Sequence, residues 1–160
     1  MEIEKPRWDH MRSSVFPHFA EIARENLHYS LWCEEKLKDL YEEGASLTGD
    51  EADWFYLDKV SPIRKIQYCC CMITIVFAAL AVEGYLYDYA ARNLSGKFIR
   101  EHLDNLKTVS KWLVIPKLVT GKDFPKGGKA FQLLKQLIEN RNFLAHSKSE
   151  EYYYRYFLRY

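Results

Sequence analysis

The stretch of 15 residues from Tyr68 to Val82, YCCCMITIVFAALAV, limits the possible folds of this chain more than any other feature. A membrane-spanning helix needs about 20 apolar residues, whereas this run is shorter and is followed at once by Glu83. The helical spacing of apolar residues nevertheless continues beyond it, through Leu86 and Ala90. The run therefore predicts a central helix that is buried on most of its sides, in a protein with no membrane partner.

Apolar residues recur at helical spacing along most of the remaining chain, and no alternating run is long enough to build a sheet. Gly44 ends the first helical pattern, and Pro116 is expected to break or kink a later one. Helices are predicted at 14–43, 63–93, 98–108 and 130–147, with loops at 45–62 (ordered, with room for a short helical turn) and 121–129. The sequence thus predicts an all-α, up-and-down bundle of four to five helices in one domain, 1–160, ending in an aromatic and basic tail, 150–160.

Charge is distributed unevenly along the chain. The formal net charge is +1, but residues 1–80 hold 9 basic and 14 acidic residues, and residues 81–160 hold 14 and 8, which gives −5 and +6. A total charge this close to zero produces little long-range attraction. The basic C-terminal half therefore permits a polyanionic partner without requiring one.

The cysteines and the N-terminal residues predict a cytoplasmic location. Cys33 stands alone and Cys69, Cys70 and Cys71 are adjacent, so neither a disulfide framework nor a CxxC zinc site is indicated. Reduced, buried thiols are the better interpretation. The N-terminus MEIEKPRWDHMR holds acids and an early proline where a signal peptide would have an apolar segment.

Two charged residues occupy the apolar faces of predicted helices. On a helical wheel, Arg141 lies within about 60° of Leu134, Leu137, Ile138, Leu144 and Ala145, while Asn142 and His146 lie just beyond one edge of that stripe. Glu83 lies in the middle of an apolar face of the central helix in the same way. A buried arginine needs an acceptor, so we predict that Arg141 meets Glu83, directly or through a hydroxyl or a water. A purely structural ion pair is the alternative.

The six residues Arg141 to His146, RNFLAH, resemble the R-x4-H signature of the HEPN superfamily, and Glu83 in AVEGYLYDYA resembles the acidic position often found on its preceding helix. The resemblance implies a helical bundle that forms a homodimer, with both motifs at one cleft. It also implies a metal-independent endoribonuclease, in which His146 acts as acid or base, Arg141 stabilises phosphoryl charge and Glu83 holds Arg141. Asn142 would orient the phosphate or cap the motif of the other copy.

Further consequences of the resemblance concern partners. Such enzymes can be the toxic half of a toxin-antitoxin or defence system, which implies an antitoxin protein partner. In members that pair with a minimal nucleotidyltransferase antitoxin, the histidine is followed by x-Tyr, whereas this chain has Lys148 at that position. That form of regulation is therefore not expected here. The alternative function is a non-catalytic scaffold of the same fold that binds a nucleotide or a protein.

Four basic residues are candidate RNA contacts: Lys126 and Lys129 in the glycine-rich loop, Lys148, and Arg155 in the tyrosine-rich tail. The loop can equally be a solvated one, and the tail can pack its rings on the bundle or across a dimer interface. No cofactor and no metal site are predicted. Glu25 and His28 form one Glu-x-x-His, but a di-iron site in a bundle needs a second copy of that motif.

Overall fold

The computed structural model describes residues 14–146, and this part of the chain is helical throughout, without a strand. The prediction of an all-α fold is confirmed. The helices are α1 (Phe16–Gly44), α2 (Asp50–Phe55), α3 (Ser61–Asn93), α4 (Gly96–Phe98), α5 (Thr108–Thr120) and α6 (Lys129–His146), with π-helical turns at Tyr56–Val60 and Ile99–Leu103.

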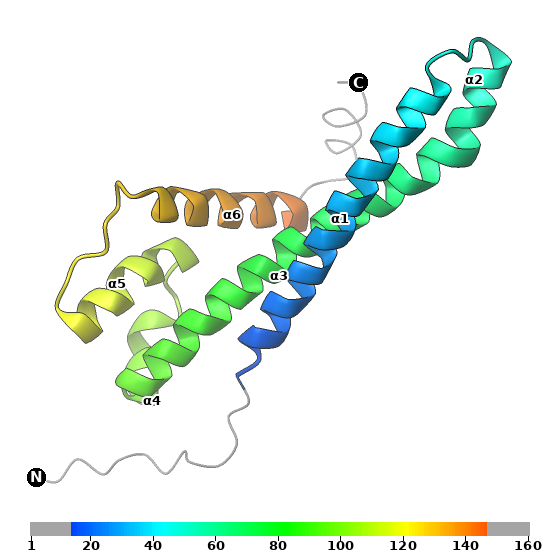
Figure 1. Cartoon of the computed structure of the whole chain (residues 1–160). Helices are drawn as coiled ribbons and strands as arrows, with labels where there is room; N and C mark the ends of the chain where they lie inside the picture. Colours follow the sequence, from blue (N-terminus) through cyan, green and yellow to red (C-terminus); the bar gives the residue numbers. More distant parts are fainter. Residues whose placement is uncertain (1–13, 147–160) are drawn as a thin grey trace, which may run out of the picture.

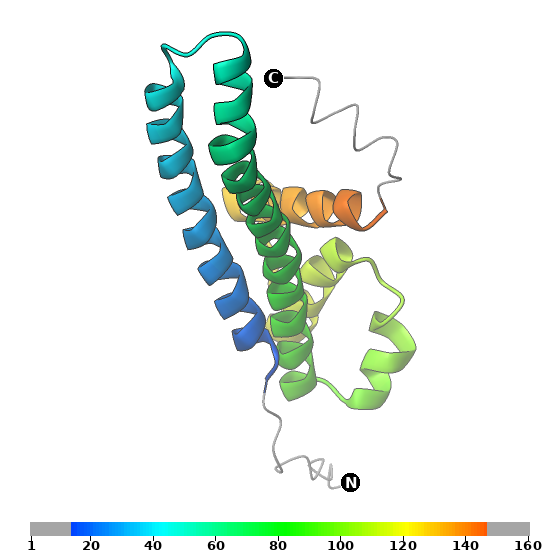
Figure 2. The ribbon, with the colours of Figure 1, turned by 90° about the vertical axis from the view of Figure 1, so that its right-hand side faces the viewer.

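The two longest helices, α1 and α3, lie side by side and antiparallel over most of their length (Figures 1 and 2). Aromatic rings fill the seam at one end, where the ring centroids of Phe19 and Phe77 are 5.7 Å apart. Farther along, the hydroxyl of Ser30 lies 3.0 Å from the sulfur of Cys71. This pair forms a helical hairpin on which the other elements are mounted.

The segment 45–62, predicted to be an ordered loop, is instead helical from Asp50 onward. It continues through the π-helical turn into α3, giving one helix of 44 residues, Asp50–Asn93. Three acids in the first turn of α2 favour the helix start, because they face the positive end of the helix dipole. By length and composition alone this helix is apolar enough to cross a membrane. Only 22% of its most apolar window of 18 residues is buried, so the prediction of a central helix buried on most of its sides is wrong for the single chain.

The shorter helices pack on the C-terminal half of α3. In Figures 1 and 2, α6 crosses α3 instead of running along it, and α5 lies beside both. The π-helical turn after α4 and the middle of α5 close the core over α3. That core consists of the buried side chains of Leu86, Ala90, Ile99, Leu103 and Ile115.

After α3, the prediction of one helix at 98–108 is wrong, and of the two outcomes predicted for Pro116 the break is absent. The stretch 98–108 is not one helix, because α4 and its π-helical turn end at Leu103 and α5 begins at Thr108. Pro116 does not break its helix but lies inside α5. Burial of the preceding Ile115, which is 1% exposed, favours the continuous helix and offsets the cost of about 3 kcal/mol for an internal proline. Gly121 ends α5 in the left-handed conformation (φ 72°), which glycine adopts without strain.

The other end of the α1–α3 hairpin has no third layer of helix over it (Figure 1). We call residues 31–67 the distal hairpin: the C-terminal half of α1, α2, and the first turns of α3. Many large apolar side chains are exposed there, namely Leu31, Trp32, Tyr41, Trp54, Tyr56, Leu57 and Ile66.

Candidate functional site

The expected contact between Glu83 and Arg141 is present in the structure. Nη2 of Arg141 on α6 donates to Oε1 of Glu83 on α3 over 2.5 Å. The side chains are 25% and 22% exposed, respectively, so both charges are largely withdrawn from water. The ion pair therefore fixes the C-terminal part of α6 against the middle of α3.

A third helix joins this ion pair through a hydroxyl group. Thr108, the first residue of α5, donates its Oγ1 hydrogen to the same Oε1 of Glu83 over 2.6 Å. Glu83 is thus the point at which α3, α5 and α6 meet. Sequence reasoning allowed for a hydroxyl at Glu83 but did not identify Thr108, because a single threonine at a helix start produces no periodic signal.

A second polar contact between α3 and α5 lies one helical turn from the contact of Glu83 with Thr108. It was not predicted from the sequence either. Lys111 of α5, three residues after Thr108, is only 7% exposed, and its ammonium donates to the hydroxyl of Tyr87, four residues after Glu83. The same nitrogen lies 4.4 Å from the centroid of the Tyr87 ring. None of the ion pairs within residues 14–146 includes Lys111.

The junction of α3, α5 and α6 therefore holds two cations, Arg141 and Lys111, and one anion, Glu83. A cation removed from water without a carboxylate is costly, so the excess positive charge favours an anion at this junction. Nε of Arg141 is buried and has no acceptor within the described residues. Glu83 therefore leaves at least one donor of the guanidinium unsatisfied.

The remaining two residues of the motif face solvent. Asn142 and His146 are both exposed, and His146 is the last residue of α6. His146 follows Arg141 by five positions, which corresponds to about 140° around the helix and about 7.5 Å along it. Arg141 points to α3, so the structure places the imidazole on a different side of α6 from the guanidinium.

The lysines of the loop lie at the opposite end of α6. Lys126 and Lys129 are exposed, and the 12 residues from Lys129 to Arg141 span about 18 Å of helix. Within one copy, the structure does not bring these lysines to the Arg141 site. Lys148 and Arg155 lie outside the described residues, so their assignment as RNA contacts stays a prediction.

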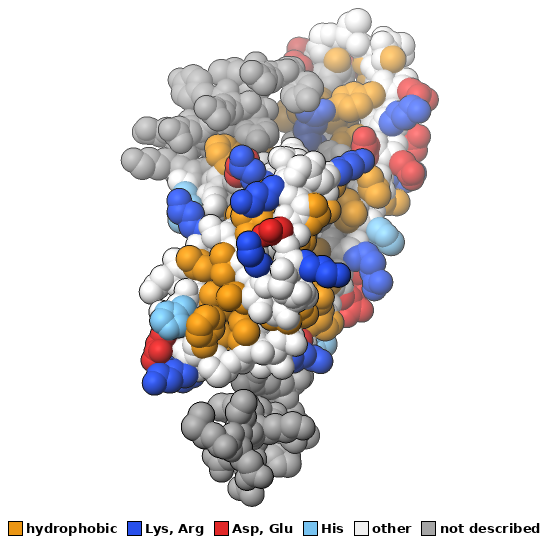
Figure 3. All heavy atoms as spheres, turned by 90° about the vertical axis from the view of Figure 1, so that its left-hand side faces the viewer, with side chains coloured by type: hydrophobic (Ala, Val, Ile, Leu, Met, Phe, Trp, Pro, Cys, Tyr) orange, Lys and Arg blue, Asp and Glu red, His pale blue; other side chains and the backbone are white. Residues whose placement is uncertain are grey.

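The loop lysines belong to a wider basic surface. We call residues 107–146 the α5–α6 region; it holds 8 basic and 2 acidic residues, a net charge of +6. Figure 3 shows Lys and Arg side chains gathered over this end of the molecule. One of the two acids, Asp123, is paired with Lys117 over 2.7 Å, and this hydrogen bond holds the pKa of the Asp123 carboxyl below its usual value.

Among residues 14–146, no three His, Cys, Asp or Glu side chains gather in a group that could hold a metal ion. Glu25 and His28 are exposed on α1. Comparisons of the chain with protein families, with curated proteins and with solved structures found no match.

Proposed function

We propose that this protein is a metal-independent endoribonuclease of the HEPN type, acting as a homodimer in the cytoplasm. The observation that carries the proposal is the largely buried ion pair of Arg141 with Glu83, set in a region of net charge +6. An arginine oriented by an acid on another helix keeps its remaining N–H groups in a fixed direction. A guanidinium oriented in this way matches the oxygens of a phosphate.

In the proposed reaction, His146 removes the proton of a ribose 2′-hydroxyl while that oxygen attacks the adjacent phosphorus. The bond from phosphorus to the 5′ oxygen of the next nucleotide breaks, and this oxygen takes a proton from the imidazolium of the other copy. The products are a 2′,3′-cyclic phosphate and a free 5′-hydroxyl. Arg141 stabilises the charge on the phosphoryl oxygens, and Asn142 orients the phosphate.

The directions of the side chains favour a dimeric site. Arg141 points toward α3 and His146 is exposed at the helix end, so two copies facing each other surround a phosphate better than one does. Exposed apolar side chains of the distal hairpin outside the α1 face of Leu31 and Tyr41, namely Trp32, Trp54 and Leu57, also favour contact with a second chain, in which up-and-down packing would be completed between copies. The basic α5–α6 region, with Lys126 and Lys129, would attract the RNA backbone.

A second function is favoured by the same ion pair. Glu83 accepts hydrogen bonds from both Arg141 and Thr108. These contacts also connect α3, α5 and α6, which is a structural role. On this alternative the fold is a non-catalytic dimeric scaffold for a nucleotide or protein partner. A nuclease would in addition need a restraining protein, such as an antitoxin, whereas a scaffold would not.

The test is cleavage of an unstructured RNA by the purified protein in EDTA, followed by gel electrophoresis and analysis of the product ends. We expect the parent protein to produce cyclic phosphate ends and His146→Ala to lose at least 100-fold in rate. His102→Ala is the matched control, because His102 is also exposed but lies in the π-helical turn after α4. It should cleave at the parental rate.

Equal cleavage by the parent and by His146→Ala would identify a contaminating nuclease and reject the proposal. No cleavage by a well-folded parent that still binds a nucleotide or a protein would favour the scaffold. A protein that is monomeric at the assay concentration would exclude the two-copy site, which analytical ultracentrifugation measures directly.

A further inference from the structure

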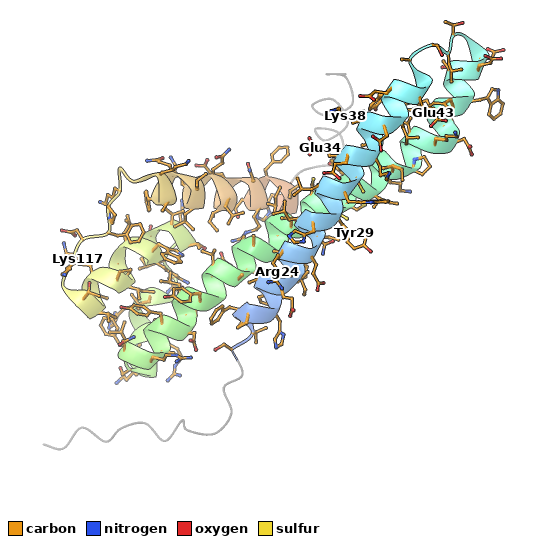
Figure 4. The ribbon with its side chains drawn as sticks, viewed as in Figure 1. Arg24, Tyr29, Glu34, Lys38, Glu43 and Lys117 are labelled. Carbon is orange, nitrogen blue, oxygen red and sulfur yellow. The ribbon has the colours of Figure 1, made fainter. Side chains whose placement is uncertain are left out.

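The distal hairpin carries a groove with a volume of about 880 Å³ between α1 and α3. Its α1 residues share one face of the helix, because Leu31, Lys38 and Ala45 are seven positions apart. From Leu31 to Ala45 the groove extends over about 21 Å of helix. In Figure 4, Glu34 and Lys38 lie on the half of α1 that extends beyond the end of α6.

The groove combines negative charge with exposed apolar surface. Glu34, Glu35 and Glu42 line it together with one lysine, Lys38. Arg64 adds a second positive charge next to it, because its guanidinium donates to the Tyr41 hydroxyl. The net charge is therefore −1, from three acids and two bases.

Two exposed apolar residues alternate with these acids along the groove. Leu31 is 49% and Tyr41 is 44% exposed, which is high for side chains of this size in a helix pair. A suitable occupant therefore has positive charges and aromatic or aliphatic side chains in alternation.

We propose that the C-terminal tail of the same chain, residues 147–160, occupies this groove. The tail is SKSEEYYYRYFLRY, in which five tyrosines, a phenylalanine and a leucine alternate with Arg155 and Arg159. Extended chain advances about 3.3 Å per residue, so the two arginines are about 13 Å apart. Glu35 and Glu42, seven residues apart on α1, are separated by about 10.5 Å. The charges of the tail and of the groove are thus similarly spaced.

The tail is also long enough to reach the groove. The near end of the groove, at Leu31, is adjacent to Ser30, which contacts Cys71 of α3. Cys71 is 12 residues, or about 18 Å, from Glu83, at which Arg141 anchors α6. The turn of α6 from Arg141 to His146 adds about 7.5 Å to that distance. About eight extended residues after His146 cover both lengths, which leaves 155–160 to lie along the groove.

In this arrangement Tyr156 and Tyr160 cover Leu31 and Tyr41 and are not available to stack on RNA bases. The path of the chain after His146 is then fixed along the hairpin. The inference does not depend on the proposed ribonuclease activity, because it uses the Glu83–Arg141 contact and His146 only as points along the path of the chain and not for their chemistry.

Hydrogen exchange of the full-length protein, followed by mass spectrometry, tests this contact. We expect residues 155–160 to exchange at least tenfold more slowly than an unstructured peptide of the same sequence. The double variant Glu35→Arg, Glu42→Arg should remove this protection. Adding Arg155→Glu and Arg159→Glu to that variant should restore it, because the charges are then exchanged between groove and tail.

The matched control is Glu25→Arg, Asp39→Arg, which makes the same change of charge on exposed positions of α1 outside the groove. It should leave the tail protected. Exchange of the parental tail at the unstructured rate would overturn the proposal, as would protection that ignores the groove charges. Protection that disappears on dilution would assign the groove to the tail of a second copy and would overturn the intramolecular contact.

Discussion

The two halves of α3 belong to one continuous helix but lie in different surroundings. In the C-terminal half, Leu86 is 2% exposed and Ala90 is fully buried, because α5, α4 and the turn after it cover them. In the N-terminal half, Ile66 and Ile73 are 46% and 37% exposed, because α1 is the principal neighbour there. The same type of side chain therefore contributes differently to stability according to how many elements cover it.

Two ion pairs of the molecule show the same contrast. The pair of Glu83 and Arg141 measures 2.5 Å and is about three-quarters buried, whereas that of Glu43 and Lys59 measures 2.6 Å with side chains 55% and 46% exposed. Distance alone does not distinguish them. Water screens the exposed pair, and the buried pair is held among three helices.

The largest difference is expected from apolar truncation. Leu86→Ala should lower the free energy of unfolding by about 3 kcal/mol, since it removes a buried side chain and leaves a cavity. Ile66→Ala, the matched change in the other half of α3, should cost less than about 1 kcal/mol. Urea denaturation measures both. A loss at Ile66 as large as at Leu86 would show that the distal hairpin is covered in solution, as in a dimer.

A smaller difference is expected from the two ion pairs. Arg141→Ala should cost about 2 kcal/mol, somewhat below the value for a fully buried pair, because it leaves Glu83 with only the Thr108 hydroxyl. Lys59→Ala should cost less than about 0.5 kcal/mol. Thermal and urea denaturation at two salt concentrations would check these values. Equal losses in the two variants would refute the distinction between the pairs.

The smallest effect concerns the thiols along the α1–α3 seam. Burial, and secondarily the neighbouring thiols, raises the pKa of Cys33 and of Cys70 above the usual cysteine value. A raised pKa lowers the fraction of thiolate at any pH below it, so these two should react with iodoacetamide at pH 8 at least tenfold more slowly than the exposed Cys69 and Cys71. Mass spectrometry of time points gives the rates. If all four cysteines reacted in native buffer at the rate measured in urea, the α1–α3 hairpin would open freely and the predicted difference would be absent.

The parts of the structure that the sequence predicted are those with a local or periodic cause. Gly44 lies at the end of α1, as its position after the last apolar repeat indicates. The contact of Glu83 with Arg141 followed from two charges on two apolar faces, because each needs a partner and the other helix supplies one. Periodicity along each helix was sufficient for that inference.

The parts that were missed depend on which helices come together. Thr108 and Lys111 join the site only because α5 packs beside α3, and nothing in their local sequence indicates this. Pro116 remains helical because the buried side chain before it fixes the helix in place. The helix from Asp50 onward replaced an expected loop, since turn-forming residues there are outweighed by acids at the helix start. In each case tertiary packing or capping decided between local alternatives.

The continuous helix from Asp50 to Asn93 also determines the shape of the molecule in solution. Its 44 residues extend about 66 Å, whereas a compact chain of 160 residues has a radius of gyration of only about 15 Å. A straight rod of that length would alone have a radius of gyration of about 19 Å. An isolated copy should therefore tumble as an elongated body, with rotation about its long axis faster than end-over-end rotation.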